Sequence, residues 1–125
     1  MATGKKVLII EDDTFLQGLA AKKLSAGGYK VLTAGSSDDA SAIIEKDTPD
    51  IVLLDLLFPG GSDGFGILKK IRENTKLSKV PVVIFSNLAE EKDVIKAKEL
   101  GATDYLIKAN FTLDELIEKV KVLIG

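Results

Sequence analysis

Residues 7–13 have the sequence VLIIEDD, which joins a wholly apolar run to three consecutive acidic side chains. A short apolar run rich in β-branched residues is typical of a strand that is buried on both faces of a sheet. Glu11, Asp12 and Asp13 follow the run directly, so they stand at its carboxyl end. The stretch therefore predicts a central strand that delivers carboxylates to one edge of a sheet.

Four further apolar runs predict strands, and a helical pattern follows each of the five. These runs are residues 30–34 (KVLTA), 51–54 (IVLL), 81–85 (PVVIF) and 105–107 (YLI). The run at 30–34 is the most polar and is expected at an edge of the sheet. In the first helical segment the apolar residues at helical spacing are Phe15, Leu16, Leu19, Ala20 and Leu24.

Helix boundaries carry their usual signals. Gly27 and Gly28 stop the first helix, Ser36 is placed to cap the second, and Gly101 ends the fourth. Thr112 and Glu115 have the spacing of a capping box at the start of the last helix.

Strict alternation of strands and helices implies an α/β fold with a parallel sheet, helices on both faces and right-handed crossovers. Five strands in 125 residues favour a flavodoxin-like doubly wound (βα)5 sandwich with strand order 2-1-3-4-5. In that order the strands at 7–10 and 51–54 are neighbours, and ligands bind just beyond their carboxyl ends. We therefore expect functional residues directly after the strands.

Complementary groups stand at these strand ends. Asp55 follows the strand at 51–54 and would join Glu11 and Asp12, while Ser86 and Lys108 follow the fourth and fifth strands. Carboxylates without His or Cys suit Mg²⁺ or Mn²⁺, and a hydroxyl with an ammonium suits a phosphoryl group. Individually, each residue also has a structural interpretation, such as a solvated helix start or a helix cap. Together they favour phosphoryl transfer onto an aspartate.

Composition removes several classes of protein. The chain has 125 residues, 46% of them hydrophobic, with a net charge of −2 and neither Cys nor His. It therefore lacks disulfides, thiolate or His-ligated metal sites, a Ser-His-Asp triad and a phosphohistidine, and it lacks the basic charge of a nucleic-acid binder. Arg72 is its only arginine, which excludes a cluster of arginines on phosphate. With no targeting or membrane-spanning segment, we expect one cytoplasmic domain over residues 1–125.

The sequence resembles the receiver domain of two-component response regulators, in particular the single-domain chemotaxis regulators, over essentially its full length. The matching segments are residues 7–13, 49–59, 63–64, 81–86 and 101–108. The resemblance implies that a sensor histidine kinase phosphorylates Asp55. It implies a metal site of Glu11, Asp12, Asp55 and the backbone carbonyl of Leu57, with Asp12 a direct ligand and Glu11 acting through water. Asp13 is expected to start a helix.

The resemblance also implies a switch. Ser86 and Lys108 would bind the phosphoryl group, and the ring of Tyr105 would move into space that Ser86 leaves. This would remodel the surface of the fourth helix, fifth strand and fifth helix, where a downstream protein would dock. The phosphodonor would be a histidine kinase or a phosphotransfer protein, and neither nucleic acid nor a membrane is expected as a partner.

Four features depart from the family pattern or vary within it. Ala109 follows Lys108 where the family usually has Pro, so a cis bond is not expected there. The loop before Gly64 is one residue longer than usual, and Asn87 replaces a small residue. Leu57 and Leu88 are apolar where the family tunes attack by water, which predicts slow self-dephosphorylation.

Three other functions fit the sequence less well. An aspartate-nucleophile phosphatase usually carries a second acid two residues after its nucleophile, where this chain has Leu57. An FMN carrier would require a phosphate-binding loop at residues 11–13, where the acidic side chains of this chain would repel a phosphate. A pseudo-receiver that acts without phosphorylation is disfavoured by the complete set of acidic, hydroxyl and lysine groups. We therefore expect a signalling domain without an output domain in this chain, and not an enzyme that turns over external substrates.

Overall fold

The computed structural model describes residues 4–58 and 64–125, and it has the predicted α/β architecture. The strands are β1 (Lys6–Ile10), β2 (Lys30–Ala34), β3 (Ile51–Leu54), β4 (Val82–Ser86) and β5 (Asp104–Ile107). The helices are α1 (Thr14–Ala26), α2 (Ser37–Lys46), α3 (Gly64–Glu73), α4 (Glu91–Glu99), α5 (Leu113–Ile124) and the short 3-10 helix η2 (Lys108–Asn110). All five strands pair in parallel in the order β2-β1-β3-β4-β5, which confirms the predicted fold class.

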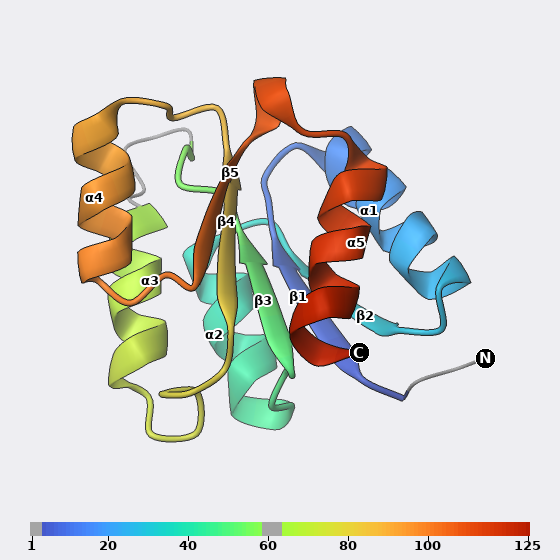
Figure 1. Cartoon of the computed structure of the whole chain (residues 1–125). Coiled ribbons are helices and arrows are strands. Elements are labelled where there is room, and N and C mark those ends of the chain that lie inside the picture. The colour runs from blue at the N-terminus through green and yellow to red at the C-terminus, as the bar shows by residue number, and fades with distance from the viewer. Residues whose placement is uncertain (1–3, 59–63) are drawn as a thin grey trace.

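Helices cover both faces of the sheet, with α2, α3 and α4 on one side and α1 and α5 on the other (Figure 1). Alternate residues of each strand point to opposite faces, so the apolar core is divided into two clusters. One cluster packs Leu8 and Leu54 of the sheet against α2, α3 and α4, and the other packs Ile9 and Leu53 against α1 and α5. Burial on both faces is the physical reason that β1, β3 and β4 are almost wholly apolar.

The edge strand β2 is less buried than the central strands. Val31 and Leu32 are half-buried and Thr33 is exposed, which agrees with the more polar sequence of this strand.

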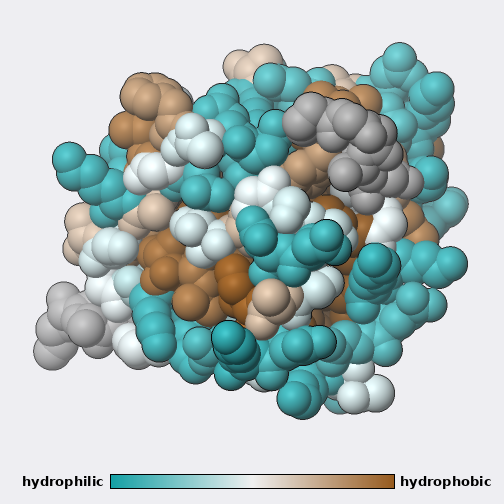
Figure 2. Space-filling view, turned by 180° about the vertical axis from the view of Figure 1, so that it is seen from behind, coloured by the Kyte–Doolittle hydropathy of each residue, from teal (hydrophilic) through white to brown (hydrophobic). Residues whose placement is uncertain are grey.

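Seen from behind, the molecule has a band of hydrophobic surface bordered by hydrophilic residues (Figure 2). Among the residues that the structure describes, none forms a helix of the length and apolarity that crossing a bilayer requires.

The boundary signals act as predicted, with small shifts at three strands, of which β1 begins at Lys6 instead of Val7. Ser36 caps α2, and Thr112 with Glu115 forms the capping box of α5. Strand β4 begins at Val82 instead of Pro81, because proline has no N–H for the ladder. It also includes Ser86, which pairs with Ile107 of β5, and β5 itself begins at Asp104.

The apolar face predicted for α1 was partly wrong. Leu16, Ala20 and Leu24 face the core at a spacing of four residues, whereas Phe15 is 75% exposed and Leu19 is also exposed. The stripe of positions 15 and 19 is rotated about 100° from the stripe that packs on the sheet. Helical spacing alone did not separate these two neighbouring stripes.

Arg72 has a structural role: it bonds to backbone carbonyls at the end of the sheet where β4 and β5 begin. Its guanidinium donates hydrogen bonds to the carbonyl oxygens of Leu77 (2.9 Å), Val80 (2.6 Å) and Gly101 (2.9 Å). Gly101 has a φ of +103°, and a Cβ there would lie 2.8 Å from the Arg72 side chain. The only arginine therefore joins the end of α3 to the segments that precede β4 and β5.

Candidate functional site

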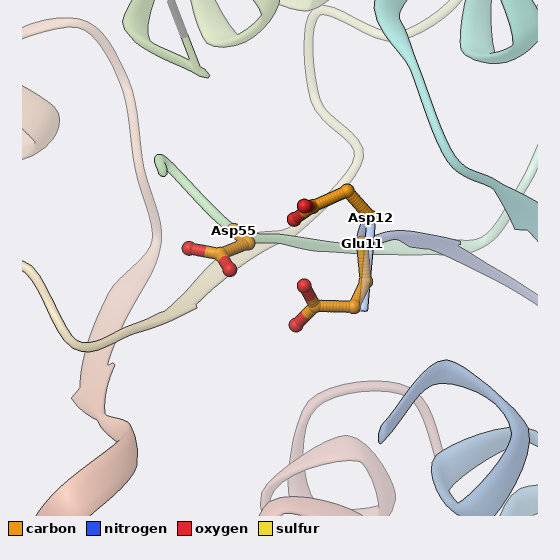
Figure 3. A group of neighbouring side chains, drawn as sticks. All are labelled: Glu11, Asp12 and Asp55. Carbon is orange, nitrogen blue, oxygen red and sulfur yellow. The ribbon is translucent and has the colours of Figure 1, made fainter. Parts of the chain in front are cut away.

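The predicted functional side chains converge at the carboxyl ends of the strands. Glu11 and Asp12 follow β1, Asp55 follows β3, Ser86 is the last residue of β4 and Lys108 follows β5. In Figure 3 the carboxylates of Glu11 and Asp12 extend toward Asp55, and each of the three residues has a carboxylate oxygen within 4.8 Å of the others. A backbone hydrogen bond from Asp55 N–H to Ile10 O (3.0 Å) holds the ends of β1 and β3 together.

Lys108 pairs with two of these carboxylates. Its Nζ atom lies 2.6 Å from Oε1 of Glu11 and 2.8 Å from Oδ2 of Asp55. The side chains of Glu11 and Asp55 are almost completely buried, so the charges attract one another in a medium of low dielectric constant. The backbone after Lys108 turns into η2, and every peptide bond of the described residues is trans, including the bond to Ala109.

The site contains fewer positively charged groups than carboxylates. Burial, with a contribution from the charge of Asp55, raises the pKa of Glu11 to about 7 despite the contact with Lys108. Burial would also raise the pKa of Asp55, but hydrogen bonds from Lys108, the Leu57 N–H and Ser86 outweigh it, so this pKa lies below its usual value. Three carboxylates facing one ammonium form a group that fits a divalent cation.

The turn between β1 and α1 is built by Asp13. Its side-chain Oδ1 accepts hydrogen bonds from the N–H groups of Phe15 (3.0 Å) and Leu16 (3.1 Å), which caps the helix. Asp13 is therefore a helix-start residue, as predicted. Because its carboxylate is used in this way, only Glu11 and Asp12 of the three consecutive acids belong to the acidic cluster.

Asp55 is also held from its own loop. Its Oδ1 accepts a hydrogen bond from the Leu57 N–H (3.0 Å), while Lys108 occupies Oδ2. The side chain of Leu57 is 46% exposed and so does not serve to cover the core, whereas Leu88 is half-buried against it. The predicted longer loop lies at residues 59–63, outside the described residues, and Asn87 is exposed.

Gly64 packs against the backbone that carries Asp55, a role that was not predicted from the sequence. Its N–H donates to Leu56 O (3.3 Å), and a Cβ at this position would lie 2.4 Å from the Leu56 Cα and 2.9 Å from Asp55 O. Only glycine allows this approach. The Asp-Gly pair at residues 63–64 was the available signal, but its meaning depends on a contact with a segment eight residues away.

A chain of hydrogen bonds leads from Ser86 to Tyr105. The Ser86 hydroxyl donates to the Asp55 carboxylate and accepts from the Leu88 N–H (3.2 Å), and the Tyr105 hydroxyl donates to Leu88 O. Tyr105 is buried, and this burial, with the charges of Asp93 and Asp55, raises its pKa to about 12. Its hydroxyl therefore stays protonated and able to donate. The predicted movement of the Tyr105 ring into space that Ser86 leaves on phosphorylation stays a prediction, because the structure shows only that Tyr105 is buried.

The fold and this grouping of side chains define a doubly wound α/β domain with an acidic site at the carboxyl ends of its strands. The sequence profile described as "Response regulator receiver domain" matches residues 7–121. The chain therefore belongs to the response regulator receiver domain family. Receiver domains are signalling domains of two-component systems, in which information passes as phosphorylation.

Individual relatives support the same family. The Staphylococcus aureus transcriptional regulatory protein KdpE is 37% identical over 118 residues, which cover 94% of this chain and 49% of KdpE. The receiver domain of the Francisella response regulator 1452 has a TM-score of 0.85 at 30% identity and covers 96% of both chains. The Mn²⁺-bound form of response regulator Rcp1 has a TM-score of 0.79 at 28% identity, covering 94% of this chain and 90% of that one. The chain spans about half the length of the curated relatives it matches.

Replacing Gly64 by alanine should disturb the site through the backbone. We expect Gly64→Ala to lower the free energy of unfolding by about 2 kcal/mol, because the new Cβ would overlap backbone atoms of Leu56. Gly66→Ala in the same helix is the control, since nothing lies within 4 Å of its Cβ position. It should be neutral or stabilising by up to about 1 kcal/mol. Urea denaturation measures both, and equal values for the two variants would contradict the assigned contact.

The raised pKa of Glu11 predicts a pH dependence of stability in the absence of divalent cations. Between its ordinary value of 4.5 and about 7, the folded chain keeps a proton that the unfolded chain has released. This stabilisation is present below pH 4.5 and is lost as the pH rises through 7. Relative to Glu11→Gln, the wild-type free energy of unfolding should fall by about 1–3 kcal/mol between pH 5 and pH 8.

Urea denaturation in a chelator, at several pH values, tests this expectation. Glu45→Gln is the control because Glu45 is exposed. Its stability should follow the wild-type pH profile. Parallel profiles for wild type and Glu11→Gln would show that Glu11 ionises normally.

Proposed function

We propose that this receiver domain accepts a phosphoryl group on Asp55 from a phosphohistidine of a sensor histidine kinase or phosphotransfer protein. The observation that carries the proposal is the placement of Asp55: its Oδ2 lies 2.8 Å from Lys108, and its carboxylate faces Glu11 and Asp12. A nucleophile between a cation site and an ammonium is suited to an anionic phosphoryl group. The chain has no histidine, so the donor is another domain.

We assign Glu11, Asp12, Asp55 and the backbone carbonyl of Leu57 to a Mg²⁺ site, which Mn²⁺ also fits. The donor set consists of oxygen atoms, the ligands that these hard cations prefer. The related regulator Rcp1 has a Mn²⁺-bound form, which supports this assignment. A cation bound there would offset negative charge that builds up on the phosphoryl oxygens.

The remaining steps of the proposed phosphoryl transfer are carried out by the side chains of Asp55, Lys108 and Ser86. A carboxylate oxygen of Asp55 forms the new bond to phosphorus while the bond from phosphorus to the donor histidine nitrogen breaks. Lys108 then transfers its hydrogen bond from Asp55 to a phosphoryl oxygen, and Ser86 donates its hydroxyl to another. No side chain has to remove a proton from Asp55, because its lowered pKa keeps it ionised.

The proposed output begins at Ser86. When the Ser86 hydroxyl turns to the phosphoryl group, it gives up the hydrogen bond from Leu88, and the Leu88 carbonyl holds Tyr105. The change therefore reaches β5 and the neighbouring helices α4 and α5. On this surface Ile95 and Val122 are exposed, and Lys119 pairs with Asp104 at 2.7 Å. We propose that a downstream protein docks there.

The family supports a wider proposal about the whole chain. We propose that residues 1–125 form one receiver domain that acts in the cytoplasm, contacts neither nucleic acid nor a membrane directly, and catalyses only its own phosphorylation and dephosphorylation. KdpE and other relatives are transcriptional regulators, and the chain corresponds to about half of each. Leu57, exposed and apolar beside Asp55, offers no second acid for a phosphatase acting on external substrates.

Incubation with acetyl phosphate and Mg²⁺, followed by intact mass, tests the central assignment. Wild type should gain one phosphoryl group, because the small donor needs only the site itself. Asp55→Asn should gain none, and Asp38→Asn, which alters an exposed aspartate, should behave as wild type. A chain that gains no phosphoryl group from acetyl phosphate or from a phosphohistidine donor would be a pseudo-receiver, and the proposal would be wrong.

The lifetime of the phosphorylated form should be long. Leu57 and Leu88 present no polar group that could orient a water molecule for attack on the acyl phosphate. We expect the double variant Leu57→Asn/Leu88→Glu to lose its phosphoryl group at least about tenfold faster than wild type. Intact mass after removal of the donor gives both rates. Equal rates, or a slower variant, would show that these positions do not limit attack by water.

A further inference from the structure

Gln17 is the only glutamine of the chain, and it is not among the residues proposed to bind the phosphoryl group or the cation. It lies in α1, where its side chain turns back toward the end of β1. The side-chain amide nitrogen Nε2 donates a hydrogen bond of 2.9 Å to the backbone carbonyl oxygen of Glu11. The partner is therefore not a side chain of the acidic cluster but the peptide unit that joins its two consecutive members, Glu11 and Asp12.

Both polar backbone groups of Glu11 are fixed. Its N–H donates to Ala34 O of β2 at 2.9 Å, and its carbonyl accepts from Gln17. The first bond continues the ladder between β1 and β2, whereas the second comes from a helix side chain. Because the peptide unit is planar, fixing the carbonyl of Glu11 also fixes the direction in which Asp12 leaves the strand.

The backbone of the same turn is anchored to α1 at the same place. The Gln17 N–H donates to Asp13 O (2.9 Å), and the Asp13 N–H donates to Oε2 of Glu11 (3.2 Å). Gln17 thus contacts the turn twice, through its backbone at Asp13 and through its side chain at Glu11. The side chain of Asp13 caps the helix but makes no bond to the Glu11 carbonyl, which accepts its hydrogen bond from Gln17.

An uncharged donor suits this position. Gln17 and Glu11 both line a cavity of about 20 Å³ that also reaches Asp55, so a charge on this side chain would act directly on the cluster. A glutamate would add a further carboxylate and lack the donor. A lysine or arginine would compete with a cation for the same carboxylates. The amide supplies the hydrogen bond and leaves the charge of the cluster unchanged.

We propose that Gln17 is a positioning residue for the metal site: it holds the Glu11–Asp12 peptide so that both carboxylates face Asp55, without touching the ion itself. The inference rests on the proposed Mg²⁺ site at Glu11, Asp12 and Asp55. Groups that orient metal ligands through hydrogen bonds commonly change metal affinity by ten- to a hundredfold when they are removed.

Isothermal titration of the full chain with Mg²⁺ tests the proposal. Gln17→Met keeps much of the volume and length of the side chain but has no donor, and it should weaken Mg²⁺ binding by about tenfold or more. Gln17→Asn keeps the amide but is one methylene shorter, so it should also bind Mg²⁺ more weakly. Ser25→Met, an exposed position near the other end of α1, is the control and should bind as wild type does.

A second readout separates positioning from loss of stability. The ¹⁵N shift of the Asp12 amide, recorded without metal, reports hydrogen bonding at the preceding carbonyl. It should move in Gln17→Met and stay in place in Ser25→Met. Wild-type affinity in Gln17→Met, or an equal loss in Ser25→Met, would overturn the role of Gln17 and leave the proposed function intact. Absence of Mg²⁺ binding by wild type would overturn the metal site, and the positioning role with it.

Discussion

Two buried carboxylates share one ammonium group in this molecule, and the rest of the structure is arranged around that contact. Lys108 meets Glu11 and Asp55 at 2.6 and 2.8 Å, although they lie 97 and 53 residues away in the sequence. Burying such charges is tolerable only when they are paired, and one lysine cannot neutralise two buried acids with Asp12 beside them. The site therefore keeps an excess of negative charge, which favours a cation, beside an ammonium that favours an anion.

The parallel sheet is what makes this contact possible. Every strand points the same way, so the residues that follow β1, β3 and β5 arrive at one edge whatever their separation in the chain. The neighbours β1 and β3 bring the carboxylates together, and β5 supplies the lysine from across β4. The strands themselves contribute mainly apolar burial, while the functional side chains are Ser86 at the end of β4 and the first residue or two beyond β1, β3 and β5.

The sequence predicted the strand order and the convergence of Glu11, Asp12, Asp55, Ser86 and Lys108, because both follow from alternation and from strand ends. It did not predict which stripe of α1 would face the solvent, since Phe15 and Leu16 differ only in the rotation of the helix. It also missed Gly64 and Gln17. Their roles are contacts with the backbone of residues 55–56 and 11, and a backbone contact leaves no pattern in residue type alone. The inward position of Tyr105 likewise depends on a partner, the Leu88 carbonyl, that any residue could supply.

The clamp formed by Arg72 has a consequence for motion in the helix that follows β4. Arg72 ties the carbonyl of Gly101, just past the C-terminal end of α4, to the segment before β4. At the other end of α4, the N-cap residue Glu90 makes no side-chain capping bond, and it follows the loop held by Ser86 and Tyr105. One end of α4 is thus tied to the segment before β4, whereas the loop that leads into its other end is held by two side-chain hydrogen bonds to Leu88. A change at Ser86 should therefore swing α4 about its C-terminal end instead of translating it, so that the largest displacement falls on the first turn of the helix.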